Sequence, residues 1–440
     1  MSARLRNTYR AFCPVFVYRD PALRQDFFVR MFMKASLWDK LKDRIGAFAK
    51  ELPSDFDPSL LPDFTDKDEE ALLLLPGFCD VHVHFREPGF SYKETIKSGS
   101  LSAARGGYTD VCTMPNVFPV PDCLENLEKQ LNLIHRDAII GIHPFGAISV
   151  GEKGEVLSDM ESLAPHVCGF SDDGKGVQSE KLMLCAMEKA KAIDKVLSAH
   201  CEDNTLLFGG YIHDGAYAKA HGHRGISSES EYRPIERDIR LCEKTGCAYH
   251  VCHISTHESV TLIREAKKRG VNITCETAPH YLVLCDEDLR EDGRFKMNPP
   301  LRSRDDREAL IEGLCDGTID MIATDHAPHS AEEKAKGLSG SAFGIVGLET
   351  AFPILYTELI QKGRVPFERV LDALILAPRK RFALPRRNGF SIWDISKESE
   401  ILPAEFSSLG KATPFEGSKV HAENLLTVYN GKIVYQNIEN

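Results

Sequence analysis

Residues 80–89 read DVHVHFREPG, and the valines that alternate with histidines in this stretch predict a buried strand. Side chains alternate across a strand, so His82 and His84 project from the same face. A buried imidazole is costly unless another group pairs with it. The pair therefore predicts either hydrogen-bonded core histidines or two ligands of a metal ion, for which imidazole is a common ligand.

Seven further apolar runs follow this one, and helical patterns separate them. The eight runs cover residues 72–84, 107–116, 138–149, 166–174, 195–203, 248–255, 271–281 and 320–329. Eight strand–helix units in succession predict an α/β fold, a (β/α)₈ TIM barrel. Ser91 with Glu94 and Ser255 with Glu258 have the spacing of helix-capping boxes.

Most of the runs end in a histidine, an aspartate or an asparagine. His200 ends the fifth run, His253 the sixth and Asp325 the eighth, while Asp172 and Asp173 end the fourth. The carboxyl ends of barrel strands carry the active site in this architecture. Together with His82 and His84 these donors suit one or two Zn²⁺ ions, because nitrogen and oxygen ligands are both present. His221 and His223 repeat the spacing in a glycine-rich loop without strand signals, so we set them aside.

Arg86, Asn116 and Asn298 form a second group near the same strand ends. Asparagine at a turn is usually turn chemistry alone. An arginine next to a metal pair is unusual, because like charges repel. It is explained if a substrate anion lies between them, since arginine binds a carboxylate through two parallel hydrogen bonds.

The two ends of the chain differ from the middle in composition. Residues 29–52 have a helical pattern, and residues 51–70 are acidic and contain prolines. From Gly389 the pattern becomes β-like, and Asn430-Gly431 predicts a tight hairpin. We therefore expect an N-terminal, largely helical extension over 1–70, the barrel over 71–388 and a small flanking β-structure over 389–440.

Composition excludes several classes of function. The 440 residues carry a formal net charge of −11, which argues against a nucleic-acid partner. The sequence has no transmembrane-length apolar run and no glycine-rich phosphate loop, so we expect neither a membrane span nor a nucleotide cofactor. The 13 cysteines are irregularly spaced and without a CxxC pair, which suits a reducing, cytoplasmic location.

From about residue 75 onward the sequence resembles the amidohydrolase superfamily and, within it, the type I dihydroorotases. The resemblance is carried by PGFCDVHVHFREPG (76–89), FSDDGKGVQ (170–178), AHCEDN (199–204), YHVCHISTHESV (249–260), KMNPPLRSRDD (296–306) and IATDHAPHSAEEK (322–334). It implies a zinc-dependent enzyme of pyrimidine synthesis that closes N-carbamoyl-L-aspartate to dihydroorotate and opens the ring again.

The resemblance also implies residue roles. It assigns His82, His84, Asp173 and Asp325 to one metal ion, Asp173, His200 and His253 to a second, and the acid/base role to Asp325. The positions that match substrate contacts are His84, Arg86, Asn116, Asn298, His329, Phe343 and Gly344.

Two features depart from many relatives. The fourth strand ends in Asp172-Asp173 where many relatives carry a carboxylated lysine. Residues 1–70 look helical where relatives usually begin with strands of a small sandwich, so that sandwich is expected to be incomplete.

Some alternatives stay open at this point. Another cyclic amidase, such as an allantoinase or dihydropyrimidinase, is the nearest rival, although its neutral substrate would not need Arg86. A non-catalytic scaffold subunit is the rival from another class, and the full set of ligand residues argues against it. A homodimer and an association with aspartate transcarbamoylase are also open. Residues 331–344 are either a mobile lid or an ordinary surface loop.

Overall fold

The computed structural model describes residues 21–64 and 67–437 of the chain. Its larger part is the predicted barrel of parallel strands. The barrel strands are β2 (Phe78–Val83), β3 (Tyr108–Thr113), β4 (Gly141–Pro144) continued by β5 (Gly146–Ala147), β6 (Gly169–Ser171), β7 (Val196–Ala199), β10 (Ala248–Val251), β11 (Ile273–Thr277) and β12 (Met321–Ile322).

The strands pair in chain order around the barrel. β2, β3 and β4 form one parallel sheet, and β5, β6, β7, β10, β11 and β12 form a second one. Phe145 separates β4 from β5 within a single stretch of chain. The ring closes where Val83 bridges His326 and the His84 amide donates to the His326 carbonyl at 2.9 Å. The (β/α)₈ barrel expected from the eight apolar runs is confirmed.

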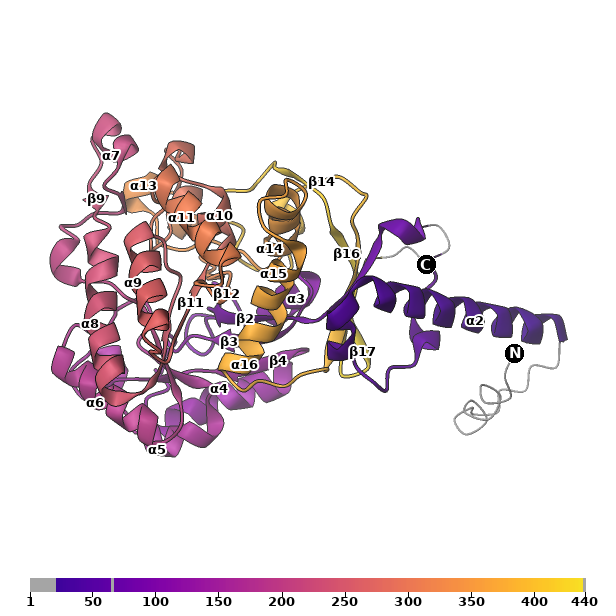
Figure 1. The fold of residues 1–440 in the computed structure, drawn as a ribbon, viewed down its shortest axis with the longest axis horizontal. Helices are drawn as coiled ribbons and strands as arrows, with labels where there is room; N and C mark the ends of the chain where they lie inside the picture. The colour runs from indigo at the N-terminus through magenta and orange to yellow at the C-terminus, as the bar shows by residue number, and fades with distance from the viewer. Residues whose placement is uncertain (1–20, 65–66, 438–440) are drawn as a thin grey trace.

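The helices lie around the outside of the strands (Figure 1). They are α3 (Ile96–Arg105), α4 (Leu124–Asp137), α5 (Met160–Leu163), α6 (Glu180–Ala192), α8 (Glu229–Thr245), α9 (His257–Lys268), α11 (Arg304–Cys315), α14 (Ala351–Leu355), α15 (Phe367–Leu371) and α16 (Ala377–Arg381), with π-helical η9 (Tyr356–Ile360) and η10 (Asp372–Leu376). No helix in the described part of the chain is both long and apolar enough to cross a membrane.

Two predicted helix starts are wrong. The side chain of Thr95 caps α3 and that of Thr256 caps α9, where Ser91 and Ser255 were expected. The Ser255 hydroxyl and amide instead donate to the buried carboxylate of Glu231.

The loops between these elements carry short segments. They are η4 (Val150–Glu152), η5 (Ala164–His166), η6 (Asn204–Leu206), β8 (Ile212–His213), α7 (Ala216–His221), β9 (Gly225–Ile226), α10 (Pro279–Val283), η7 (Asp286–Asp288), η8 (Gly293–Phe295), α12 (Ala331–Lys334), α13 (Gly337–Gly340), β14 (Ser399–Glu400), η11 (Pro403–Glu405) and β15 (Lys419–Val420).

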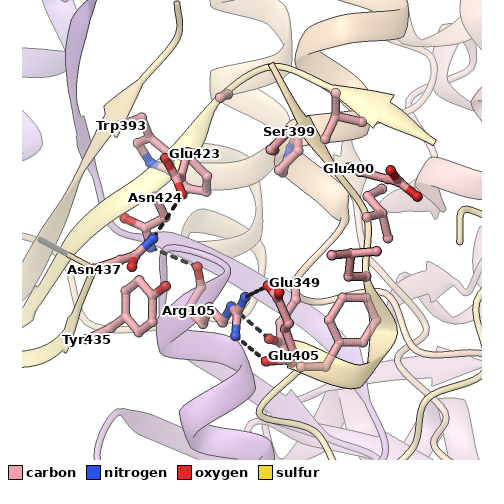
Figure 2. A pocket seen from close by; sticks show the side chains of 16 residues that line it. Arg105, Glu349, Trp393, Ser399, Glu400, Glu405, Glu423, Asn424, Tyr435 and Asn437 are labelled. Carbon is pink, nitrogen blue, oxygen red and sulfur yellow. Dashed lines mark hydrogen bonds and ion pairs between the residues drawn. The ribbon is translucent and has the colours of Figure 1, made fainter. Parts of the chain in front are cut away.

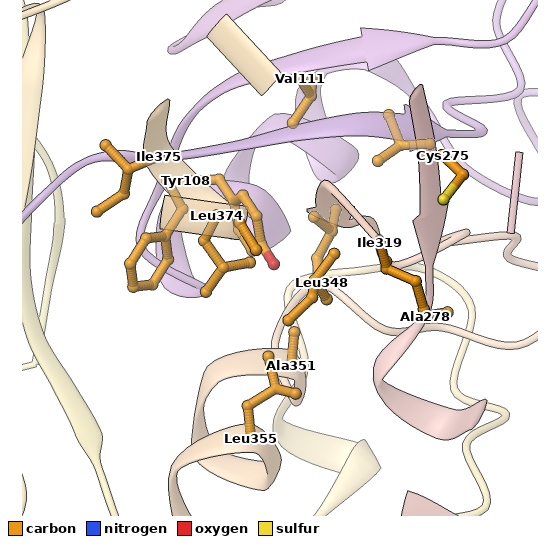
Figure 3. Packing of buried hydrophobic residues seen from close by; sticks show 14 of the residues in the cluster. Tyr108, Val111, Cys275, Ala278, Ile319, Leu348, Ala351, Leu355, Leu374 and Ile375 are labelled. Atoms are coloured by element: carbon orange, nitrogen blue, oxygen red, sulfur yellow. The ribbon is translucent and has the colours of Figure 1, made fainter. Parts of the chain in front are cut away.

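The apolar core lies between the strands and the surrounding helices. Figure 3 shows Tyr108 of β3 close to Leu374 and Ile375 of η10, which return to the barrel after its last strand. These side chains are almost fully buried. The predicted site residues lie elsewhere, at the carboxyl ends of the strands.

A small antiparallel sheet flanks the barrel, with strand order β1 (Leu72–Pro76), β13 (Gly389–Asp394), β16 (Glu423–Tyr429) and β17 (Lys432–Gln436). The predicted hairpin is present, since Asn430 and Gly431 have φ of 46° and 74° between β16 and β17. β1 pairs with β13, so residues 72–76 lie in this sheet and not in the barrel to which we had assigned them. Gly77 makes the break, because a Cβ there would lie 2.2 Å from Thr109 Cγ2.

The N-terminal extension packs on this small sheet. The helical pattern over 29–52 becomes α2 (Pro21–Arg44) and η1 (Gly46–Glu51), followed by η2 (Pro58–Leu60) and η3 (Glu69–Ala71). The ring of Trp38 lies 5.0 Å from that of Phe390 on β13, and Phe56 lies 4.7 Å from the same ring. The extension thus covers a sheet face, while the expectations for residues 1–20 lie outside the described residues.

Candidate active site

A cavity of about 240 Å³ opens at the carboxyl ends of the barrel strands. It brings together every predicted site residue except His82, which lies behind it. The lining residues are His84, Arg86, Asn116, Asp173, Gly174, His200, His253, Asn298, Asp325, Ala327, His329, Phe343 and Gly344.

His82 and His84 project from the end of β2 toward two carboxylates. His82 Nε2 lies 3.3 Å from Asp173 Oδ1, and His84 Nε2 lies 3.1 Å from Asp325 Oδ1. On its other side His82 Nδ1 lies 2.8 Å from Glu276 Oε1. That carboxylate fixes the ring so that Nε2 faces the cluster, an arrangement typical of metal-binding histidines.

Asp173 is the centre of the cluster. Its Oδ1 lies 3.6 Å from His253 Nε2 and 3.7 Å from His200 Nδ1, in addition to its approach to His82. Burial alone would raise the pKa of Asp173, but the neighbouring imidazoles outweigh burial and hold it well below its usual range. The carboxylate is therefore ionised at neutral pH.

The donor atoms of the cluster suit cations. His200 Nδ1 and His253 Nε2 lie only 3.0 Å apart, and His82 Nε2 and Asp173 Oδ1 are buried without a hydrogen-bond partner. Unpartnered buried polar atoms are rare in folded proteins. Two groups of three donors can each hold a metal ion, His82–His84–Asp173 and Asp173–His200–His253, and they share Asp173.

Asp325 follows β12 and faces the same cavity. Burial would raise its pKa, but the hydrogen bond from His84 and the charge of His82 hold the pKa at about 2. Its φ of 47° lies in the left-handed region that L-amino acids seldom adopt. This turn directs the carboxylate across the cavity from the strand end.

Arg86 and His329 line the same cavity and lie beside each other. Arg86 Nε donates to the Pro328 carbonyl at 3.2 Å, and its Nη2 lies 3.4 Å from His329 Nε2. Arg86 has no ion pair with a carboxylate among residues 33–64 and 67–437. Burial lowers its pKa to about 10, so the guanidinium remains charged at neutral pH.

The two predicted asparagines form hydrogen bonds with other side chains of the site. Asn116 Oδ1 lies 2.8 Å from His84 Nδ1, and Asn116 Nδ2 lies 3.4 Å from Asp173 Oδ2. Asn298 Nδ2 donates to Glu202 Oε1 at 2.9 Å, and its own Oδ1 is buried without a partner.

Phe343 and Gly344 line the cavity through a loop that crosses it. The Phe343 carbonyl accepts a hydrogen bond from His329 Nε2 at 2.8 Å. The Gly344 amide donates to the Lys296 carbonyl at 3.1 Å, so this amide already has a partner.

Sequence reasoning missed two carboxylates, the buried Glu276 and the partly buried Glu202. Glu276 lies inside β11 and also accepts from His250 Nε2 at 3.0 Å. Glu202 lies 3.7 Å from His200 Nε2 and holds Asn298. The available signal was the position of each residue: Glu276 is a charged residue in an apolar run, and Glu202 comes two residues after His200.

Asp172, which the sequence offered as a donor beside Asp173, and His221, which we set aside, both lie in other contacts. Asp172 Oδ1 accepts from the amides of Ile148 and Ser149, so it supports a neighbouring loop. His221 stacks on Tyr217 with ring centres 4.0 Å apart.

A second pocket of about 120 Å³ lies at the junction between the barrel and the small sheet (Figure 2). Arg105 Nε forms an ion pair with Glu349 at 3.2 Å, and Figure 2 shows Glu405 beside the same guanidinium. Arg105 thus pairs with two of the carboxylates that line this pocket, and none of the predicted site residues lines it.

Comparisons with known proteins agree with the family that the sequence resembles. The model of a family described as dihydro-orotase-like matches residues 71–259. A dihydroorotase of Bacillus cereus (strain AH820) is 48% identical over 378 residues, which cover 84% of this chain and 88% of that protein. A dihydroorotase of Bacillus anthracis has the same identity and coverage.

Two solved structures share the fold. An L-hydantoinase (dihydropyrimidinase) from Arthrobacter aurescens superposes with a TM-score of 0.74 at 25% identity, covering 83% of this chain and 86% of that one. A dihydropyrimidinase from Brevibacillus agri NCHU1002 gives 0.71 at 21% identity, covering 85% and 88%.

Proposed function

This chain belongs to the dihydroorotase family of cyclic amide hydrolases, and we propose that its cavity interconverts N-carbamoyl-L-aspartate and dihydroorotate with one or two bound zinc ions. The observation that carries the proposal is that a charged Arg86 and the ionised carboxylate of Asp325 both line one small cavity. The first recognises an acidic substrate and the second moves a proton.

The metal ions would be held by the two donor groups that share Asp173. The proposed ligands are His82, His84, Asp173 and Asp325 for one ion, and Asp173, His200 and His253 for the other. Bound zinc supplies Lewis acidity, which polarises a carbonyl oxygen and lowers the pKa of water. The mixture of imidazole and carboxylate donors supports zinc among the common divalent metals.

We propose that Arg86 binds the ring carboxylate of dihydroorotate, and that Asn116, Asn298 and His329 contact other parts of the substrate. Arg86 Nε donates to the Pro328 carbonyl and its Nη2 lies 3.4 Å from His329 Nε2, so among the described residues its Nη1 is left to bind a ligand. Asn298 offers an unpartnered oxygen to the ring, and the backbone at Phe343 and Gly344 closes the other side. A neutral ring would leave the Arg86 charge without a partner in a buried site, which is costly.

Asp325 is the proposed acid and base. In ring opening it accepts a proton from the attacking water and then donates that proton to the ring nitrogen that leaves. Its low pKa means that it starts each cycle ionised. One carboxylate can serve both transfers because they occur in sequence.

Three substrates test the proposal against its rivals. Purified metal-loaded protein should hydrolyse dihydroorotate in preference to allantoin and dihydrouracil, which lack the ring carboxylate. A preference for either neutral ring would identify an allantoinase or dihydropyrimidinase. Asp325→Asn should abolish turnover of dihydroorotate while most of the metal stays bound, and substantial activity would place the acid/base role elsewhere.

We further propose a cytoplasmic homodimer that associates with aspartate transcarbamoylase. Every cysteine that the structure describes is free, which suits a reducing compartment. The first turns of α2 extend away from the small sheet (Figure 1), and we propose that the second subunit packs beside this end of the helix. Light scattering of the purified chain, alone and with transcarbamoylase, tests both associations. A chain that stays monomeric and does not bind transcarbamoylase would refute both associations.

A further inference from the structure

Lys334 is a buried lysine at the end of α12, with only 7% of its surface exposed. Its Nζ donates to three backbone carbonyls, at 2.7 Å to Gly344, 2.8 Å to Ala342 and 3.0 Å to Lys296. Within residues 33–64 and 67–437 it forms no ion pair with a carboxylate. A protonated lysine has three N–H donors, and all three are used here.

The three carbonyls belong to two loops that line the cavity. Lys296 precedes Asn298 in the loop after β11, and Ala342 and Gly344 flank Phe343 in the loop after β12. The Gly344 amide also donates to the Lys296 carbonyl. The two loops are therefore joined both by this backbone hydrogen bond and by the Lys334 side chain.

Further contacts tie the same loop to itself and to the cavity. Ser341 Oγ donates to the Lys334 carbonyl at 2.9 Å, and the Ala342 amide donates to the Glu333 carbonyl at 3.0 Å. The Lys296 ammonium lies 4.5 Å from the centre of the Phe343 ring. Residues 331–344 are therefore a closed loop around one ammonium group, which does not favour the mobile-lid interpretation.

We propose that Lys334 is a positioning residue that holds Asn298, Phe343 and Gly344 as one rigid wall for the acidic substrate. This inference rests on the proposed function. The Lys334 side chain reaches the backbone behind the wall, so it acts through the loops and does not touch the ring.

Lys334→Met removes the charge and the donors while keeping a long side chain. We expect the KM for dihydroorotate to rise on the order of tenfold, with a smaller change in kcat and the same metal content. Lys336→Met is the matched control, because Lys336 is exposed in the same loop and should leave all three values unchanged. A lower melting temperature with an unchanged KM would show a purely structural role and overturn the inference.

Two further variants keep the inference testable if Lys334→Met does not fold. Lys334→Gln retains two N–H donors and should give a KM between those of the wild type and the methionine variant. Lys334→Ala should recover its affinity with added propylammonium but not with 1-propanol. If the wild type is active but neither variant behaves in this way, the role of Lys334 is refuted. If the wild type itself is inactive on dihydroorotate, the proposed function is refuted.

Discussion

At the residue scale, three side chains reach the cavity from strained backbone. Arg86, His253 and Asp325 have φ of 53°, 31° and 47°, in a region that side chains with a Cβ rarely occupy. Such strain persists only where the surrounding structure enforces it, and it gathers at functional sites. The sequence predicts these residues because each follows an apolar strand, but it does not reveal the turn that aims them.

The two missed carboxylates show the limit of that reasoning. A strand end is visible as a change from apolar to polar residues, so Asp173, His200 and His253 are found. Glu276 lies within the strand itself, where its partners His82 and His250 come from other strands. Only the closed barrel brings these three residues together.

The shared position of Asp173 leads to the first prediction. Asp173→Ala removes a donor common to both three-residue groups, so it should lower the bound metal as well as the rate. Elemental analysis of the purified variant measures the loss. Asp172→Asn is the neighbouring control, since the Asp172 carboxylate accepts from the Ile148 and Ser149 amides. Full metal occupancy in Asp173→Ala would contradict a bridging role.

The second prediction concerns Arg86. A hydrogen bond between charged groups contributes roughly 1.5–3 kcal/mol. Arg86→Ala should therefore lower kcat/KM for dihydroorotate by on the order of 10–200-fold. Arg86→Lys keeps the charge without the two parallel donors and should fall in between.

Metal content should be unchanged in both Arg86 variants. The competing role for Arg86 is structural, because its Nε holds the Pro328 carbonyl. A melting temperature that falls while kcat/KM stays intact would assign it that role.

At the scale of elements, the barrel strands were predictable and their edges were not. Each strand is a short apolar run that ends at a polar residue. This pattern is local, so it can be recognised in the sequence without knowledge of the tertiary contacts. Leu72–Pro76 continues without a polar break into β2, so the sequence alone joins two strands of different sheets. The helix caps were misplaced because Ser91 and Ser255 have the capping spacing but lie before the true first turns at Thr95 and Thr256.

The third prediction concerns the N-terminal extension. Trp38 is buried between Phe56 and Phe390, so Trp38→Ala leaves a cavity against the small sheet. Replacing a buried tryptophan with alanine typically costs about 3–5 kcal/mol, so the melting temperature should fall clearly. Met33→Ala is the control on the same helix, because Met33 is 53% exposed. Equal melting temperatures for the two variants would mean that the extension does not stabilise the fold.

At the scale of the whole molecule, two histidines with lowered pKa values contribute to the response to acid. Burial and the charge of Arg302 lower the pKa of His213 to about 4, and burial lowers that of His280 to about 4. The unfolded chain binds protons at these positions below about pH 6.5, whereas the folded chain does not until about pH 4. The contribution of these two histidines to the free energy of unfolding should therefore decrease as the pH falls through this window.

The fourth prediction follows from His213. Its Nδ1 lies 3.3 Å from Arg302 Nη1, and a glutamine oxygen at this position could accept the same hydrogen bond. Melting temperatures of the metal-loaded wild type and His213→Gln should be measured between pH 7 and 4.5. The wild type should lose more stability over this range than the variant does. Parallel curves would exclude His213 as a source of acid sensitivity.

The pairing of β1 with β13 has a consequence for how the chain is made. Leu74 lies opposite Ile392, so the four consecutive leucines emerge from the ribosome long before their partner strand exists. At about 5–20 residues per second the wait is roughly 15–60 s. During that time a segment well suited to β-aggregation has no native neighbour in the small sheet. We therefore expect the nascent chain to bind chaperones. A ribosome stalled shortly before residue 389 would leave the four leucines without their partner strand for as long as the stall lasts.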